Sequence, residues 1–215
     1  FKLGVKTIAM RHGLCASFMP KPKKEYNGSG MHINMSLEKD GVNVSYDKED
    51  PNHLSQEAYW FIGGIMKHIR AITAITNPVI NSYKRLVPGF EAPVYIAWSG
   101  KNRSPLIRIP AHKGGGQRIE LRSPDSAANP YLAIAVCLTA GLDGIRNQIM
   151  PPAPVDANIF NLSEEERNKR GIECLPENLM EAVQWLEKDP VILSALGEHL
   201  SEKYIQAKKR EWKEY

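Results

Sequence analysis

Residues 114–124 read Gly-Gly-Gly-Gln-Arg-Ile-Glu-Leu-Arg-Ser-Pro, and the part from 117 to 123 has the alternation of a β-strand. Successive side chains of a strand point to opposite faces, so Arg118, Glu120 and Arg122 share one face, and Ile119 and Leu121 share the other. A carboxylate flanked by two arginines suits a bound cation beside a polyanion, with Glu120 on the metal and the arginines on phosphate or carboxylate groups. A solvated face with local ion pairs is the alternative that this segment alone leaves open.

Four further segments have strand patterns. Residues 30–38 alternate apolar and polar side chains, with His32, Asn34 and Ser36 on the polar side. Residues 14–19, 94–99 and 106–110 are shorter candidates, and Asp40-Gly41 predicts a hairpin-type turn. Residues 83–93 carry a glycine and two prolines among charged residues, which predicts a loop.

Helices are predicted from periodicity and from their capping residues. Residues 1–12 form the first, with Gly13 as a stop signal. Ser55 caps a long amphipathic helix that continues to about residue 72, and Asn77-Pro78 begins a short one. Asn129-Pro130 begins an apolar helix to about residue 149. From residue 163 onward the chain is predicted to be mostly helical, with a capping box at Ser163 and Glu166 and a cap at Asp189.

The composition limits the class of protein without deciding its function. The net charge of +4 fits acidic small substrates as well as it fits nucleic acid. Glutamates interleave with the basic residues after position 202, so this segment is interpreted as a solvated helix face and not as a nucleic-acid site. Three dispersed cysteines favour a reducing, cytoplasmic compartment, and the apolar run 131–138 is too short for a membrane span. The first residue is not Met, which suggests a piece of a longer protein.

Polar clusters outside the strand point to the same chemistry. Glycines in Asn27-Gly28-Ser29-Gly30-Met31-His32 let the backbone approach a ligand closely, and His32 follows on the polar strand face, where it can bind a metal. Arginine recognises carboxylate and phosphate in a planar, bidentate manner. Together with His32 and Glu120, the arginines indicate phosphoryl transfer or another nucleotide-dependent reaction on an acidic substrate. They are Arg85, Arg103, Arg108, Arg118 and Arg122.

These motifs, in this order, resemble the C-terminal catalytic region of type I glutamine synthetase. The resemblance covers nearly the whole chain and rests on residues 18–22, 27–32, 81–93, 102–104, 118–122 and 125–131. It implies an α+β fold with a curved, mostly antiparallel sheet flanked by helices in residues 1–150 and a helical C-terminal part in residues 151–215. It also implies that the N-terminal domain and the upstream metal-binding strands of the family lie outside this sequence.

The family uses ATP to phosphorylate the side-chain carboxylate of glutamate, and ammonia then displaces the phosphate. By resemblance, the ligands of the divalent metal, Mg²⁺ or Mn²⁺, are His32 and Glu120. The glutamate site would contain Asn27, Gly28, Arg85, Glu91 and Arg122. The ATP site would contain Asn34, Ser36, Arg103, Arg108 and Arg118. Glu91 matches the glutamate of a mobile flap that takes a proton from the ammonia adduct, and Arg103 would lie closest to the transferred phosphoryl group.

The sequence also departs from the family pattern at some positions, and it lacks part of the family's active site. Asn34 stands where some members have His, and Phe160 stands where one regulated subtype has the tyrosine that is adenylylated, so no such modification is expected here. His32 and Glu120 alone are too few protein ligands for a catalytic divalent site. This piece is therefore expected to be inactive by itself, and the intact protein is expected to form a dodecamer with active sites between subunits.

Two other functions remain open at this point. A related γ-glutamyl ligase could act on a larger amine, such as a polyamine. A non-catalytic, regulatory protein with the same fold would be expected to have lost some of the six residues that matter most to the reaction. All six are present: His32, Arg85, Glu91, Arg103, Glu120 and Arg122.

Overall fold

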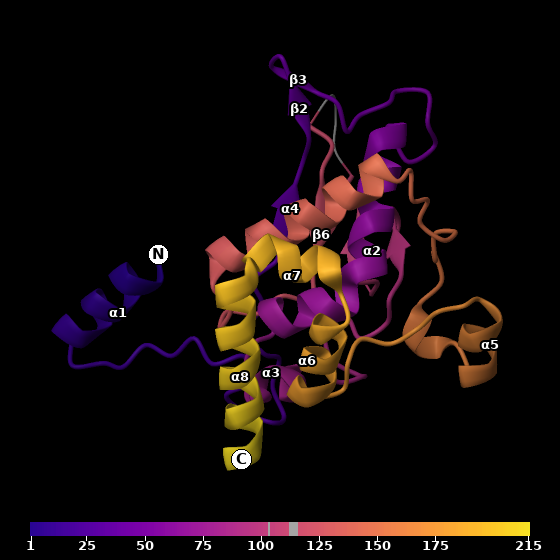
Figure 1. Cartoon of the computed structure of the whole chain (residues 1–215). Helices are drawn as coiled ribbons and strands as arrows, with labels where there is room; N and C mark the ends of the chain where they lie inside the picture. Colours follow the sequence, from indigo (N-terminus) through magenta and orange to yellow (C-terminus); the bar gives the residue numbers. More distant parts are fainter. Residues whose placement is uncertain (103, 112–115) are drawn as a thin grey trace.

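A four-stranded sheet lies at the centre of the computed structural model, which describes residues 1–102, 104–111 and 116–215 (Figure 1). The strand order is β1-β6-β5-β4. β1 and β5 are both antiparallel to β6, and β4 is parallel to β5. The expected α+β fold with a mostly antiparallel sheet is therefore confirmed. The strands are β1 (Ile33–Met35), β4 (Trp98–Ser99), β5 (Ile107–Arg108) and β6 (Ile119–Leu121), and a separate hairpin pairs β2 (Glu38–Lys39) with β3 (Val42–Asn43).

The register brings two rows of residues side by side across this sheet. Residues that face each other on paired strands point to the same side, so each row has one character. The apolar row joins the hydrophobic core and consists of Ile33, Leu121, Ile107 and Trp98. The polar row points to the other side and consists of Asn34, Glu120, Arg108 and Ser99. The predicted alternation along β6 thus separates the core from a polar surface.

Two long helices pack beside the sheet and approach each other very closely. α2 (Gln56–Thr76) begins at Ser55, whose side chain caps the amide of Ala58, and α4 (Pro130–Arg146) begins at Asn129 as predicted. A Cβ on Gly64 of α2 would lie 2.1 Å from the carbonyl oxygen of Ala140, so only glycine permits this crossing.

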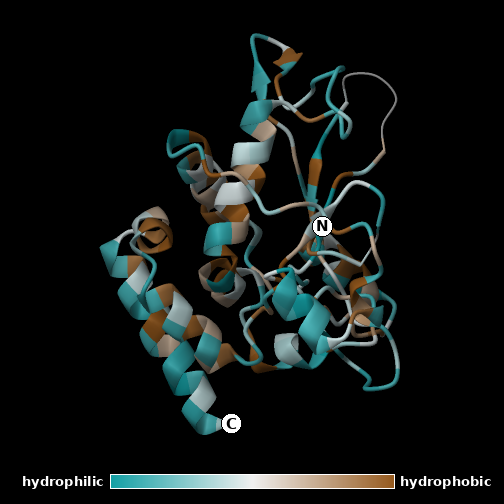
Figure 2. Ribbon diagram, turned by 90° about the vertical axis from the view of Figure 1, so that its right-hand side faces the viewer, coloured by the Kyte–Doolittle hydropathy of each residue, from teal (hydrophilic) through white to brown (hydrophobic). Residues whose placement is uncertain are grey.

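The C-terminal helices cover this pair. α6 (Leu179–Glu187) packs on α2, α7 (Pro190–Leu196) packs on α4, and α8 (Glu198–Glu214) packs on both α6 and α7. α8, which ends at the C label of Figure 2, is largely hydrophilic, and its basic residues form ion pairs such as Lys208 with Glu211 at 2.8 Å. This pairing agrees with the predicted solvated helix face. The remaining helical segments are α3 (Ile80–Arg85), η1 (Ile159–Asn161) and α5 (Glu164–Lys169), the last with the predicted capping box.

The first helix, α1 (Lys2–Arg11), lies apart from this assembly in Figure 1 and buries none of its residues. It ends as predicted before Gly13, whose φ is +68°. The strand predicted over residues 14–19 is wrong, because this segment is extended without a neighbouring strand in the part of the chain described here. Alternation alone cannot create a strand without a ladder partner.

Tertiary contacts changed three other boundaries. Asn77 does not start a helix; its backbone N–H ends α2 by bonding the Thr73 carbonyl, and its side chain donates to the Ser123 carbonyl at 2.9 Å. The next helix, α3, starts at Ile80, so the first three residues of the predicted 83–93 loop belong to its last turn. The strands β4 and β5 are shorter than the predicted segments 94–99 and 106–110. None of the helices in the described residues is long and apolar enough to cross a membrane.

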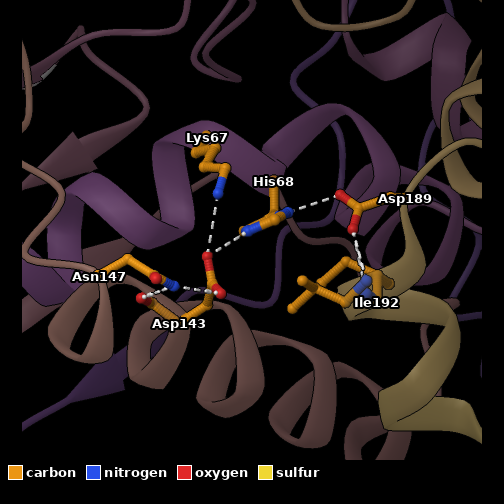
Figure 3. A network of polar contacts seen from close by, with 7 residues as sticks. Lys67, His68, Asp143, Asn147, Asp189 and Ile192 are labelled. Atoms are coloured by element: carbon orange, nitrogen blue, oxygen red, sulfur yellow. Dashed lines mark hydrogen bonds and ion pairs between the residues drawn. The ribbon is translucent and has the colours of Figure 1, made fainter.

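A partly buried polar network, centred on the buried ring of His68, joins α2, α4 and the start of α7 (Figure 3). The Nδ1 atom of His68 lies 2.6 Å from Asp189, and its Nε2 atom lies 2.9 Å from Asp143. Only the protonated ring can donate from both nitrogens. Burial disfavours that charged form, but the hydrogen bonds to Asp189 and Asp143 outweigh it, so the pKa of His68 is raised above 6.5.

Replacing His68 with glutamine is expected to lower the free energy of unfolding by about 2 kcal/mol near pH 6, because two partly buried carboxylates lose the cation that they share, while Lys67 still pairs with Asp143. The pKa of His68 is higher in the folded protein than the value of 6.5 in the unfolded chain, so protonation of the ring stabilises the folded state. This stabilisation is complete at pH values below 6.5 and is lost as the pH rises through the pKa of the folded state. The difference between the two proteins should therefore shrink as the pH rises from about 6 through the folded-state pKa of His68. Thermal melting across this pH range measures it, with His199→Gln on exposed α8 as the control. A difference that is constant with pH would contradict the charged ring.

Candidate active site

Glu120 is the centre of the polar side of the sheet. Its Oε1 atom lies 2.9 Å from Nδ1 of His32, and its Oε2 atom accepts a hydrogen bond from Nη1 of Arg108 at 3.2 Å. Beside this group, Nε of Arg118 donates to Oδ1 of Asn34 at 3.0 Å. The sheet register accounts for the arrangement, because Asn34 and Arg108 stand directly opposite Glu120 on the two neighbouring strands.

The environment of His32 favours the neutral ring. Burial lowers the pKa of His32, and the nearby Arg122 lowers it further, although the hydrogen bond to Glu120 acts in the other direction. A neutral imidazole and a carboxylate are a donor set that divalent metals accept. No group of three or more His, Cys, Asp or Glu suited to a metal occurs among the described residues. His32 and Glu120 therefore fit a divalent cation as a part of its ligand set.

Arg85 is the last residue of α3 and is only 4% exposed. Its Nη1 atom donates to the Ser123 carbonyl at 2.6 Å, just beyond the end of β6, and burial lowers the pKa of its guanidinium. Gly30 passes so close that a Cβ there would lie 2.7 Å from Nη2 of Arg85, and a Cβ on Gly28 would meet the Pro20 carbonyl at 2.3 Å. Because Gly28 and Gly30 have no side chains, the Arg85 side chain can occupy this position.

A small cavity of about 90 Å³ brings together four of the five predicted glutamate-site residues, all except Asn27. Arginines on one side and a carboxylate on the other give it the character of a site for a zwitterionic, acidic ligand. Its lining consists of Gly28, Gly30, His32, Arg85, Phe90, Glu91, Ala92 and Arg122. Five of these residues were predicted to be site residues from the sequence motifs: Gly28, His32, Arg85, Glu91 and Arg122.

A second, larger cavity of about 580 Å³ shares Phe90 and Glu91 with the first. The loop between α3 and β4 therefore borders both cavities, and Glu91 on this loop is exposed. The far wall includes Asn158 and Phe160, whose position beside Glu91 sequence reasoning did not anticipate. No signal in the sequence links residues nearly seventy positions apart, apart from the family resemblance around Phe160.

Two predicted site residues stand outside this grouping. Ser36 continues the exposed polar face after β1 but lines neither cavity and forms no hydrogen bond with the other site residues in the part described. Arg103 lies outside the described residues. The other predicted residues lie on the polar side of the sheet or around the two cavities: Asn27, Gly28, His32, Asn34, Arg85, Glu91, Arg108, Arg118, Glu120 and Arg122.

Comparison with known proteins identifies the class to which this arrangement belongs. The family described as "Glutamine synthetase, catalytic domain" matches residues 1–215, and the chain therefore belongs to this family of carbon–nitrogen ligases. It is 57% identical to a glutamine synthetase of Clostridium saccharobutylicum and 59% identical to one of Methanosarcina mazei, in each case over the whole chain. The chain spans about half the length of these relatives, 48% in both.

Solved structures agree with this assignment. A GmaS–ADP complex, in its conformation 1, matches the whole chain with a TM-score of 0.89 at 41% sequence identity, and the match covers 49% of that protein. The apo form of GmaS matches with a TM-score of 0.86 at 40% identity and 48% coverage. The fold inferred from the sequence is thus the fold of the family.

Proposed function

We propose that the protein carrying this chain joins ammonia to the side-chain carboxylate of L-glutamate, with ATP converted to ADP and phosphate. The observation that carries the proposal is the small cavity in which Arg85, Arg122, His32 and Glu91 meet beside the Glu120–Arg108 pair. Buried arginines, a carboxylate and a partial metal site are the groups that an acyl phosphate reaction needs.

Glutamate binding is assigned to the small cavity. The α-carboxylate of glutamate would pair with the buried guanidinium of Arg85, and the γ-carboxylate would lie near Arg122. Asn27 and Gly28 would contact the substrate through the segment that passes Arg85. In this geometry the γ-carboxylate oxygen attacks the γ-phosphorus of ATP, which forms γ-glutamyl phosphate and releases ADP.

The nucleotide is assigned to the polar side of the sheet. Arg108, Arg118 and Arg103 would bind its phosphates, and Asn34 and Ser36 would line its site. His32 and Glu120 would hold Mg²⁺ or Mn²⁺ together with ligands outside this chain. Such a cation neutralises the negative charge that develops on the phosphate oxygens. The ADP in the related GmaS structure supports a nucleotide site on this fold.

The second step is assigned to the loop that carries Glu91. Ammonia attacks the carbonyl carbon of the acyl phosphate, the C–O bond to phosphate breaks, and Glu91 accepts the proton that the new amide nitrogen loses. The exposed loop position of Glu91, between the two cavities, supports a flap that excludes water from the reactive acyl phosphate.

Phosphate release by the full-length protein, with ATP and glutamate, tests the proposal. Strong stimulation by ammonium supports glutamine synthesis. Stimulation only by a polyamine would assign the protein to the ligases that act on larger amines, and no turnover with either amine would favour a non-catalytic role. For the full-length protein we also propose a cytoplasmic homo-oligomer, a dodecamer. The exposed apolar residues Tyr131, Ile134 and Leu138 on one side of α4 support further protein contacts.

The isolated 215-residue chain is expected to show less than about 1% of the ammonium-dependent activity of the full-length protein, because His32 and Glu120 supply only part of a metal site. Parallel phosphate-release assays at equal concentration of sites measure this. Circular dichroism of the isolated chain serves as the control for its folding. A folded fragment with full activity would contradict the incomplete site.

Replacing Gly30 with alanine is expected to raise the KM for glutamate about tenfold, since the new methyl group displaces the Arg85 guanidinium from its place. The KM for ATP should change little, because the phosphate-binding arginines lie on the sheet. Gly4→Ala is the matched control, since a Cβ at Gly4 meets nothing within 4 Å. Equal increases in both KM values would argue against a local effect on Arg85.

A further inference from the structure

Lys21 is a buried cation to which the proposed reaction gives no role. It lies in the motif of residues 18–22, and only 6% of the residue is exposed. In the part of the chain described, no carboxylate forms an ion pair with it. A buried ammonium group is costly unless other groups satisfy its donors and its charge. The groups that contact the ammonium group therefore show which segments Lys21 connects.

Two segments of the candidate site meet at its ammonium group. Nζ donates to the Tyr26 carbonyl at 2.6 Å and lies 3.4 Å from the centre of the Phe90 ring. Tyr26 directly precedes Asn27, and Phe90 directly precedes Glu91. The same cation thus contacts the segment assigned to glutamate and the loop assigned to ammonia.

The backbone of Lys21 is fixed independently of its side chain. Its N–H donates to Oδ1 of Asn81 at 2.7 Å, and Nδ2 of Asn81 donates back to the Lys21 carbonyl at 3.1 Å. Asn81 lies one turn before Arg85 on α3. The lysine is therefore anchored to the helix that places the buried arginine, and its side chain extends from a fixed point.

Phe90, in contrast, does not belong to the hydrophobic core of the described residues. Its ring lines both cavities of the candidate site and also a third cavity of about 500 Å³, where the other lining residues are Lys21, Lys24, Lys84 and Val87. The ring is partly buried, and the ammonium group of Lys21 lies on its face. Such a contact can fix the position of a ring that borders three cavities.

We propose that Lys21 is a positioning residue: it holds Phe90 by a cation–π contact and so places Glu91 beside the glutamate-binding segment. This inference rests on the proposed function for its kinetic consequence, although the contact itself can be tested without turnover. Lys21 would act on the amine step through the loop and would leave nucleotide binding unchanged.

Hydrogen exchange in the full-length protein tests the contact first. In Lys21→Met, which keeps the length of the side chain but removes the charge, the amides of residues 86, 87 and 89–92 are expected to exchange about tenfold faster, since a desolvated cation–π contact is of this order. Lys21→Arg should restore most of the protection. Lys24→Met is the matched control, because Lys24 is an exposed lysine of the same cavity. Unchanged exchange in Lys21→Met would overturn the inference whatever the reaction is.

Kinetics then test the consequence. Lys21→Met should lower kcat with ammonium about tenfold and release more phosphate than glutamine, because a loosened loop admits water, while the KM for ATP stays within about twofold. Phe90→Leu should reproduce this, and the double variant should be no worse than either single one. Additive effects would contradict the contact between the two side chains. Should Lys21→Met fail to fold, Phe90→Leu and Lys21→Arg still decide the question. Absence of ammonium-dependent turnover in the wild type would contradict the proposed function alone.

Discussion

Replacing Glu120 with glutamine is expected to lower ammonium-dependent phosphate release at least a hundredfold, an effect of about 3 kcal/mol or more. The amide keeps the shape of the side chain but cannot provide an anionic oxygen to a cation. It also weakens the contacts to His32 at 2.9 Å and to Arg108 at 3.2 Å. Because Glu120 is only 9% exposed, water cannot easily replace the lost interactions.

The measurement is the rate of phosphate release over a wide range of Mg²⁺ concentration. A lost metal ligand should shift the metal dependence to higher concentration as well as lower the maximum rate. Glu38→Gln, the same change at an exposed position of β2, is the matched control and should leave both quantities unchanged. A variant of Glu120 with normal metal dependence would remove this residue from the metal site.

Replacing Arg85 with lysine is expected to raise the KM for glutamate about a hundredfold. Lysine keeps the positive charge, but it loses the planar fork that can hold a carboxylate while donating to the Ser123 carbonyl at 2.6 Å. The site is also rigid, with Gly28 and Gly30 packed against the guanidinium, so a smaller and differently shaped cation leaves space unfilled.

Initial rates over a range of glutamate concentrations measure this effect, with ATP and ammonium saturating. Arg146→Lys at the exposed end of α4 is the control for the same chemical change. If kcat fell while the KM for glutamate stayed the same, Arg85 would act on the reaction and not on binding of the α-carboxylate.

Local sequence patterns correctly predicted those helix starts that depend only on residues nearby in the chain. Asn129, Ser163 and Asp189 cap α4, α5 and α7 as expected, because a cap depends on residues two or three positions away. Asn77 was assigned wrongly because its partners, Ser123 and Asp125, are more than forty positions away. The predicted strand at 14–19 failed for a similar reason, since pairing depends on distant segments.

The same distinction applies to the site. The alternation along β6 predicted that Glu120 shares a face with Arg118 and Arg122, but the structure pairs it with Arg108 of β5 and with His32, which directly precedes β1. Residues two apart on one strand are separated by about 6.6 Å, whereas directly opposite residues on paired strands have Cβ atoms about 5 Å apart. The motifs thus identified the participants, and only the register could identify the partners.

The distance in sequence between β1 and β6 has a consequence for synthesis of the protein. Within the described sheet β1 pairs with β6 alone, and 88 positions separate His32 from Glu120. A ribosome adds about 5–20 residues per second, so β1 waits roughly 4–18 seconds for its partner. During that interval the edge of β1 that later pairs with β6 is unpaired on the nascent chain. An unpaired strand edge can associate with other chains and cause aggregation. We therefore expect chaperones to be needed before residue 121 has been translated.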